Sequence, residues 1–245
     1  MMKLKIVASA MLVAAVLASP SVASAQVTYL DFEGIATYPT GSGVQINDFY
    51  NGGTASNGAS GANFGVQFVG GATLLCLNTA AAACSNTSRG GLGIPTSQFY
   101  ALYFPNTNPT MNVAAGFTNG LSFTYASPFA ASTVNIYSGL NGTGTLLAST
   151  ALPLTTTGAC DPTIAGGAQY CPFSPFSVGF SGTAQSVTFG GSVNSQVFDD
   201  FTFGSTVVGG AVPEPASWGL MILGFGVVGG AMRYRRRATR VAFAA

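Results

Sequence analysis

Short segments rich in Val, Thr, Phe and Tyr recur through residues 26–212, between clusters of Gly, Asn, Ser and Pro, and helical periodicity is nearly absent there. Such segments favour β-strands, and the intervening clusters favour turns. Ten or eleven short strands in one domain predict an all-β fold, a two-sheet, jelly-roll-like β-sandwich. A β-solenoid is the alternative, but the sequence has no repeat of fixed period. The predicted strands are 27–33, 65–69, 73–77, 100–104, 110–117, 121–125, 133–138, 145–151, 176–180, 186–189 and 196–203.

The N-terminus has the organisation of a secretory signal peptide. Lys3 and Lys5 precede an apolar run at 6–18, and Ala23-Ser24-Ala25 forms a small-residue cleavage site. This order predicts a signal peptide over 1–25, recognised by the Sec translocon and removed by signal peptidase. The mature chain then begins at Gln26, and we expect it to be exported.

The charge of the mature body argues against a nucleic-acid partner. Residues 26–212 hold one basic residue, Arg89, and six acidic ones, whereas nucleic-acid binding needs a basic surface. The chain also has no histidine, which is the commonest general base and metal ligand. The acidic residues are Asp31, Glu33, Asp48, Asp161, Asp199 and Asp200.

The C-terminal tail has the length and charge pattern of a membrane stop. Residues 215–232 carry no charge. At about 1.5 Å per residue these 18 residues span roughly 27 Å, close to the hydrocarbon core of about 30 Å. Trp218 suits the headgroup region, and the arginines after residue 232 suit the cytoplasmic side. We therefore expect a transmembrane helix at 216–232, with a basic tail that holds the chain transiently in the inner membrane. The arginines are Arg233, Arg235, Arg236, Arg237 and Arg240.

The same tail resembles the PEP-CTERM sorting signal of Gram-negative bacteria. The resemblance rests on Pro213-Glu214-Pro215, on Trp218, on Gly224-Phe225-Gly226 and on the arginines behind them; Gly219 stands where the motif has Ala. It implies recognition by an exosortase, a membrane cysteine transpeptidase that cuts near the motif and passes the protein to the exterior. The expected organisation is a sandwich domain at 26–204, a linker at 205–212 and a sorting signal at 213–240. The alternative is an anchor that is never processed, which would leave a tethered periplasmic domain.

Two carboxylate pairs lie at opposite ends of the body. The opening pair stands in Asp31-Phe32-Glu33-Gly34 and the closing pair in Asp199-Asp200-Phe201-Thr202-Phe203-Gly204. Both ends weakly resemble those of other PEP-CTERM passenger domains and of sandwich carbohydrate-binding modules. Strand alternation places Asp199 on one face with Val197, Phe201 and Phe203, so one of the paired aspartates is expected to point inward. Because an unpaired inward carboxylate is costly, we expect Asp31 or Glu33 and Asp199 or Asp200 to share a structural calcium ion. The alternative is that they bind backbone N–H groups or face water.

Four cysteines in an exported chain predict disulfides. Cys76 with Cys84 and Cys160 with Cys171 are close in sequence, which favours these local pairs, although three connectivities are possible. A zinc site built from the four thiolates is the rival interpretation, but the sequence has no CxxC spacing.

Aromatic residues beside polar loops offer a way to bind sugars. The best cluster is Asp48-Phe49-Tyr50-Asn51, where rings would stack on sugars beside polar groups, although core packing is the competing interpretation. We therefore expect a non-enzymatic surface or matrix protein, with no catalytic residues, that is associated with exopolysaccharide or biofilm through weak glycan affinity. The alternative in another class is a secreted polysaccharide hydrolase that uses the paired carboxylates.

Overall fold

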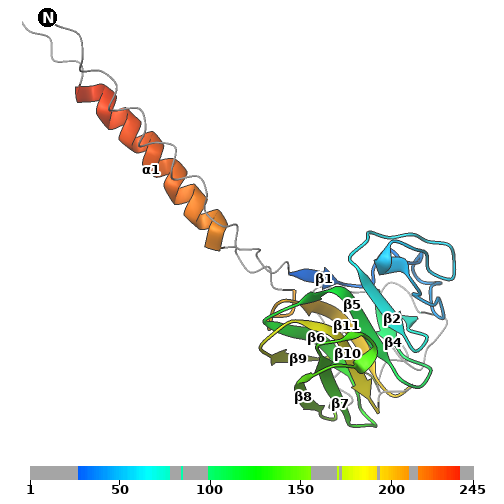
Figure 1. Ribbon diagram of the computed structural model, residues 1–245. Helices are drawn as coiled ribbons and strands as arrows, with labels where there is room; N and C mark the ends of the chain where they lie inside the picture. Colours follow the sequence, from blue (N-terminus) through cyan, green and yellow to red (C-terminus); the bar gives the residue numbers. More distant parts are fainter. Residues whose placement is uncertain are drawn as a thin grey trace, which may run out of the picture.

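The computed structural model describes residues 27–77, 84, 99–155, 170, 173–191, 194–209 and 215–237. The signal peptide, Arg89, Cys160, Cys171, Pro213, Glu214 and Arg240 lie outside this description. Within the described residues, eleven strands and one long helix form the framework (Figure 1). Every predicted strand is present, with ends that differ by a few residues. The strands are β1 (Thr28–Leu30), β2 (Val66–Val69), β3 (Thr73–Cys76), β4 (Tyr100–Tyr103), β5 (Thr110–Phe117), β6 (Gly120–Ala126), β7 (Ser132–Tyr137), β8 (Leu146–Leu152), β9 (Ser174–Gly179), β10 (Ala184–Gly190) and β11 (Val197–Phe203).

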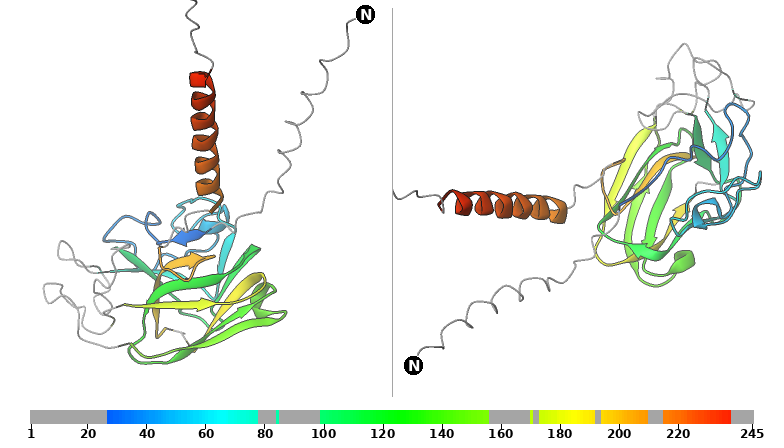
Figure 2. Two further views of the ribbon diagram at one scale, coloured as in Figure 1. Left: turned by 90° about the vertical axis from the view of Figure 1, so that its left-hand side faces the viewer. Right: turned by 90° about the horizontal axis from the view of Figure 1, so that it is seen from above.

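The strands form two antiparallel sheets that lie face to face (Figure 2). The first sheet has the order β3-β4-β11-β6-β9, with β1 also paired to β11, and the second has the order β2-β5-β10-β7-β8. The eight strands from β4 to β11 pair from the ends inward: the first lies beside the last, the second beside the seventh, the third beside the sixth and the fourth beside the fifth. That order is a jelly roll, and it confirms the predicted sandwich.

The core between the sheets is built largely from phenylalanine. Phe198 of the first sheet lies 5.0 Å from Phe189 of the second, measured between ring centroids, and Phe123 lies 6.0 Å from the same ring. Phe201 lies 5.1 Å from Phe123. All four side chains are fully buried. Each buried ring removes a large apolar area from water, so this cluster supplies much of the hydrophobic stabilisation of the domain.

The C-terminal helix α1 runs over Pro215–Arg237. The predicted helix at 216–232 is confirmed, but its assignment as a transmembrane span is not. Among the described residues, no helix has both the length and the apolar character required to cross a membrane. Five glycines lie within α1, and glycine adds no apolar side chain to the helix surface; they are Gly219, Gly224, Gly226, Gly229 and Gly230.

The first half of the predicted linker is held by hydrogen bonds, one within the linker and one to β11. The N–H of Val207 donates to the Ser205 hydroxyl at 3.0 Å, and the N–H of Gly209 donates to the Thr202 hydroxyl, also at 3.0 Å. The chain therefore stays attached to β11 as far as Gly209.

Candidate functional site

The paired aspartates of the last strand lie at a β-bulge in the middle of the first sheet. Along one side of β11 the neighbour changes from β4, opposite Phe198, to β1, opposite Phe201. On the other side the register with β6 shifts between Asp199 and Thr202. Asp200 has a left-handed backbone, with φ of 57°, which aspartate tolerates better than most residues. The bulge thus marks the point where β11 exchanges partners.

This bulge corrects the predicted alternation. Phe198, Phe201 and Phe203 all belong to the main core cluster, whereas Val197 packs in a separate, smaller cluster. The extra residue changes which positions face the core, so the prediction that Asp199 shares a face with Phe201 and Phe203 is wrong. Period-two reasoning holds only within an unbroken strand. The Asp-Asp pair was the available signal, because aspartate favours such irregular backbone.

Both bulge aspartates are buried and hydrogen-bonded. Asp199 is 1% exposed and Asp200 is 0% exposed. The Tyr29 hydroxyl donates to Asp200 Oδ1, the Thr124 hydroxyl lies 3.3 Å from Asp200 Oδ2, and the Asp200 N–H donates to Asp199 Oδ1 at 2.8 Å. These bonds replace part of the hydration that the carboxylates lose on burial.

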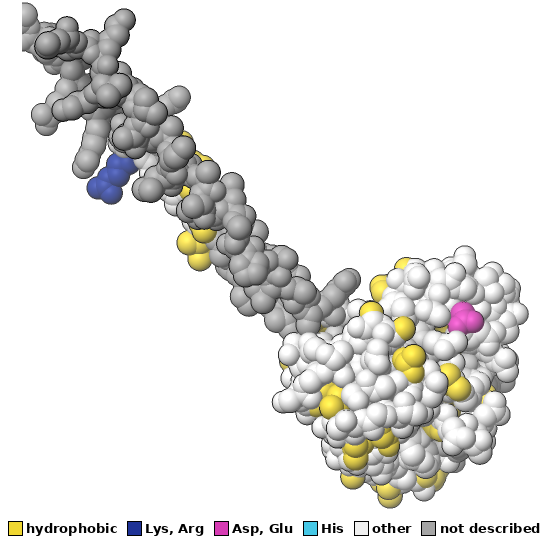
Figure 3. Space-filling model, viewed as in Figure 1, with side chains coloured by type: hydrophobic (Ala, Val, Ile, Leu, Met, Phe, Trp, Pro, Cys, Tyr) yellow, Lys and Arg dark blue, Asp and Glu magenta, His cyan; other side chains and the backbone are white. Residues whose placement is uncertain are grey.

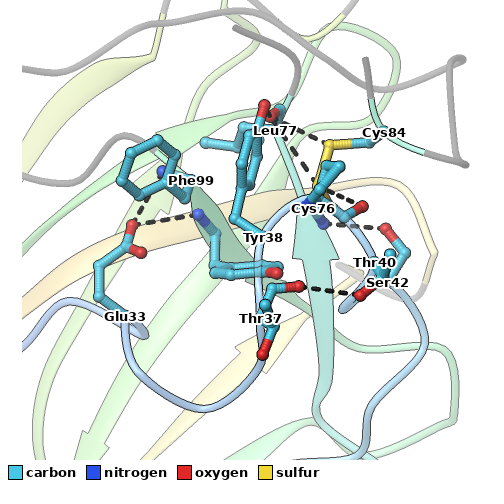
Figure 4. Close-up of a disulfide and its surroundings, with 11 residues drawn as sticks. Glu33, Thr37, Tyr38, Thr40, Ser42, Cys76, Leu77, Cys84 and Phe99 are labelled. Carbon is cyan, nitrogen blue, oxygen red and sulfur yellow. Dashed lines mark hydrogen bonds between the residues drawn. A yellow bond between two sulfur atoms is a disulfide. The ribbon is translucent and has the colours of Figure 1, made fainter. Parts of the chain in front are cut away.

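The carboxylates of the opening pair bind backbone N–H groups. Asp31 Oδ1 accepts a bond from the N–H of Glu33 at 3.2 Å. Glu33 Oε1 accepts bonds from Phe99 and Tyr100, at 2.8 and 3.1 Å from their backbone nitrogens (Figure 4). Glu33 therefore holds the first loop against the start of β4. This arrangement agrees with the alternative to a metal site, in which the carboxylates bind backbone N–H groups.

The predicted calcium site remains a prediction. Within the described ranges, no three Asp, Glu or Cys side chains come together in a way that would hold a metal ion. A calcium ion shared by one carboxylate from each pair would therefore take most of its oxygen ligands from backbone carbonyls, hydroxyls or water.

The predicted sugar-stacking cluster lies mostly inside the protein. Residues 49–51 form a short 3₁₀ helix, η1 (Phe49–Asn51), whose two rings are only 6% and 4% exposed. Asp48 is exposed and its Oδ1 accepts a bond from Gln67 Nε2 at 3.1 Å. Because Phe49 and Tyr50 pack in the core, they do not offer the ring faces on which the stacking prediction depends.

Tyr50 lies near three of the predicted site residues, Asp31, Glu33 and Asp199. Burial raises the pKa of its hydroxyl, and the charges of Asp31, Asp199 and Glu33 raise it further, although the nearby N–H of Phe32 opposes the shift. In the described structure the Tyr50 hydroxyl has no partner in hydrogen-bonding geometry. It therefore stays protonated well into the alkaline range.

The predicted disulfide between Cys76 and Cys84 is present, with its Cα atoms 5.8 Å apart (Figure 4). Beside it the Tyr38 hydroxyl donates to the Leu77 carbonyl at 3.0 Å, and the Cys76 N–H donates to Ser42 Oγ at the same distance. The disulfide fastens the end of β3 to the chain that follows, as expected for an exported domain.

Two hollows on the described part of the sandwich could admit a small ligand, and the sequence predicts neither. The first, of about 500 Å³, has both polar and apolar surface and no charged side chain, and is referred to below as the β10 groove; its lining is Thr107, Asn108, Pro109, Thr110, Asn141, Gly142, Thr188, Phe189, Gly190 and Gly191. The second, of about 300 Å³, is mostly apolar and is called the end hollow; its lining is Thr28, Val66, Val113, Ala115, Gly116, Phe117, Thr118, Thr183 and Phe203. Neither is lined by a carboxylate. Only the fold brings the Asn141-Gly142 turn to β10.

Comparison with known proteins decides the role of the tail. Residues 211–237 match the family model of the PEP-CTERM protein-sorting motif. The chain carries a PEP-CTERM sorting motif. The motif implies export to the cell surface, with an exosortase as the processing partner. The predicted tail residues from Pro213 to Arg237 all fall within the matched range.

The sandwich that carries this PEP-CTERM motif has a more distant likeness. No curated protein matches the sequence. Among solved structures, a carbohydrate-binding module (CBM6cm-2) from Cellvibrio mixtus lichenase 5A, in complex with cellotriose, is similar at 12% identity and a TM-score of 0.31. The match covers 47% of this chain and 84% of that one. At this level, the likeness bears on neither ligand nor activity.

Proposed function

We propose that this chain is a non-catalytic protein of the cell surface or extracellular matrix, which an exosortase sorts and cleaves and which associates with exopolysaccharide in a biofilm. The observation that carries the proposal is the position of the PEP-CTERM motif. It begins at residue 211, directly after a jelly roll that is complete at Phe203 and bonded as far as Gly209. Cleavage near the motif would therefore release the sandwich with every described strand in place.

The surface of the sandwich supports a polysaccharide partner. Of its described carboxylates, Asp199 and Asp200 are buried, Asp31 and Glu33 are partly buried, and Asp48 is exposed. The face in Figure 3 consists mostly of uncharged polar and backbone atoms, with scattered apolar side chains. Hydroxyl and amide groups both donate and accept hydrogen bonds, as sugar hydroxyls do. Such a surface suits a hydroxyl-rich polymer better than a highly charged one.

The arrangement of the carboxylates supports a binding role over hydrolysis. A glycosidase needs two carboxyl groups that face a common substrate cleft. Here Asp200 accepts bonds from Tyr29 and Thr124 inside the domain, and Glu33 accepts bonds from the backbone of β4. These carboxylates hold strands together, so the hydrolase alternative gains no support from them.

Fractionation with intact mass measurement tests the proposal. We expect the parent protein outside the cell, in the polysaccharide fraction, with a mass that begins at Gln26 and ends close to Pro213–Pro215. Substituting Glu214→Ala should leave a full-length tail in the cell envelope, whereas the control Asp48→Asn, on the exposed surface of the sandwich, should be sorted normally. Parent protein that keeps residues 233–245 and stays with the membrane fraction would contradict exosortase processing. Correctly cleaved protein found only in the soluble medium would contradict the polysaccharide association.

A further inference from the structure

We propose that the β10 groove binds a segment of a neutral, hydroxyl-rich polysaccharide. This inference rests on the proposed association with exopolysaccharide and assigns it a site. The groove lies on the outer face of the second sheet, because the core-facing residues of the same strands are Met111, Val187 and Phe189. Thr110 of β5 and Thr188 of β10 are paired across the strands and belong to its lining.

One wall of the groove is a turn that is bonded onto the sheet. The short helix η2 (Leu140–Gly142) joins β7 to β8 and contacts β5, β7 and β10. Asn112 of β5 holds it twice: its Nδ2 donates to Asn141 Oδ1 at 2.7 Å, and its Oδ1 accepts the Asn141 N–H at 2.8 Å. The Gly142 N–H donates to Ser186 Oγ of β10 at 2.9 Å. The wall is therefore held in place before any ligand arrives, which lowers the entropy cost of binding.

The other wall is the loop before β5, where Thr107 and Asn108 are exposed. The Thr110 hydroxyl donates to the Asn108 carbonyl at 3.1 Å and so supports this loop from below. Asn108 and Asn141 both have left-handed backbones, with φ of 60° and 57°. Asparagine tolerates this conformation better than most residues, so both turns keep their shape without a large strain cost. The groove thus presents polar groups on two fixed walls.

The lining specifies the chemistry of the ligand. It offers threonine hydroxyls, asparagine amides and the glycine backbone at 190–191, without a charged side chain. Hydroxyls and amides pair with groups that both donate and accept, which describes the hydroxyls of an uncharged sugar. The volume of about 500 Å³ falls in the usual range of small-ligand sites. Phe189 is 0% exposed and offers no ring face, so recognition depends on hydrogen bonds.

Affinity electrophoresis of the processed protein, recovered from the cell exterior, tests the groove. The probes are three neutral polymers (a β-glucan, a galactomannan and a xylan) and one anionic polymer, alginate. Thr188→Val removes one hydroxyl at nearly constant shape, and Asn108→Gly removes one amide while tolerating the left-handed backbone. Thr183→Val, in the end hollow, is the matched control. Circular dichroism and thermal unfolding show whether each variant keeps its fold.

We expect the parent to be retarded by at least one neutral polymer and much less by alginate. Each groove variant should weaken this binding about five-fold, as the loss of one hydrogen bond of about 1 kcal/mol implies, and the double variant should weaken it more. Thr183→Val should bind like the parent. Equal retardation of the parent and the double variant would overturn the groove assignment, as would stronger binding to alginate or no binding to any neutral polymer.

A second readout separates the groove from the proposed function. In cells, the double variant should be cleaved normally but released from the polysaccharide fraction into the medium. A double variant that stays in that fraction overturns the groove and leaves the matrix role intact. A parent protein that is absent from the fraction contradicts the matrix role itself.

Discussion

The hydroxyl of Tyr29, in β1, donates a hydrogen bond to the carboxylate of Asp200, in β11, 171 residues later in the chain. This contact joins the first strand to the last at the point where β11 exchanges β4 for β1. Thr124, from β6 on the other side, approaches the second carboxylate oxygen at 3.3 Å. The three side chains hold together the centre of the first sheet, around an acid that is 0% exposed.

The substitution Tyr29→Phe should destabilise the domain. It removes a donor from a buried carboxylate, and hydrogen bonds to charged groups contribute about 1.5–3 kcal/mol. We expect the free energy of unfolding to fall by about that amount in urea titrations. The control is Tyr137→Phe, a half-buried tyrosine of β7 that should change stability by less than about 0.5 kcal/mol. Equal stabilities for the two variants would show that the Tyr29 bond contributes nothing.

The substitution Tyr50→Phe should have the opposite effect. The Tyr50 hydroxyl is buried without a partner in the described structure, so removing it relieves a desolvation cost of about 1 kcal/mol. Tyr125→Phe is the matched comparison, because the Tyr125 hydroxyl donates to the Pro153 carbonyl at 3.1 Å and its loss should cost about 1 kcal/mol. Thermal unfolding of both variants checks the signs. A loss of stability for Tyr50→Phe would indicate a hydrogen bond that the structure does not show.

Alkaline pH should destabilise the protein. Burial raises the pKa of Tyr50, Tyr100 and Tyr125 in the folded state, whereas tyrosines of the unfolded chain ionise near pH 10. Below that pH both states are protonated and stability does not depend on these groups. Above it, the unfolded state releases protons that the folded state retains, so stability falls by up to about 1.4 kcal/mol per pH unit for each such tyrosine.

Urea titrations between pH 8 and 11 measure this slope. We expect Tyr50→Phe to make it shallower, because one group that retains its proton is removed. A slope that is the same with and without Tyr50 would mean that its hydroxyl ionises equally in both states.

The substitution Gly61→Ala should disturb the core through Phe49. A Cβ at position 61 would lie 2.4 Å from Cε1 of the Phe49 ring, which is 6% exposed and has little room to move. Overpacking of this kind costs about 1–3 kcal/mol. The control is Gly179→Ala at the end of β9, where the nearest atom to the new Cβ lies 3.6 Å away. Thermal unfolding of the two variants compares them, and equal melting temperatures would contradict the close approach.

The calcium prediction has a direct measurement. If Asp31 or Glu33 shares an ion with Asp199 or Asp200, calcium at about 100 times its Kd would stabilise the fold by about 2.7 kcal/mol. For a domain of this size, EDTA would then lower Tm by about 5–10 °C. The double substitution of Asp199→Asn and Asp200→Asn should abolish this shift, and Asp48→Asn should preserve it. A Tm that EDTA leaves unchanged would exclude a structural calcium ion at this position. The hydrogen bonds alone would then stabilise these carboxylates.

The sequence by itself determined the features that depend on neighbours along the chain. Strands such as Thr110–Phe117 are set by runs of β-forming residues between turn residues, so each was predicted to within a few residues. The disulfide of Cys76 and Cys84 joins cysteines only eight positions apart. The PEP-CTERM motif is a linear pattern that its family model matches over 211–237. None of these features requires knowledge of which distant segments meet.

Only the tertiary structure decided the features that depend on contacts between segments far apart in the sequence. β11 pairs with β4, β1 and β6, and the bulge at Asp200 lies where β4 gives way to β1. Because of this bulge, Phe201 faces the opposite side of the sheet from the one that unbroken alternation after Asp199 predicts. Phe49 and Tyr50 have the same local pattern whether buried or exposed, and their burial follows from packing against the core. The β10 groove exists because Asn112 and Ser186 hold the 140–142 turn against the sheet, across 29 and 44 residues of chain. Contacts of this kind follow from the order of strands in space, which local sequence patterns do not encode.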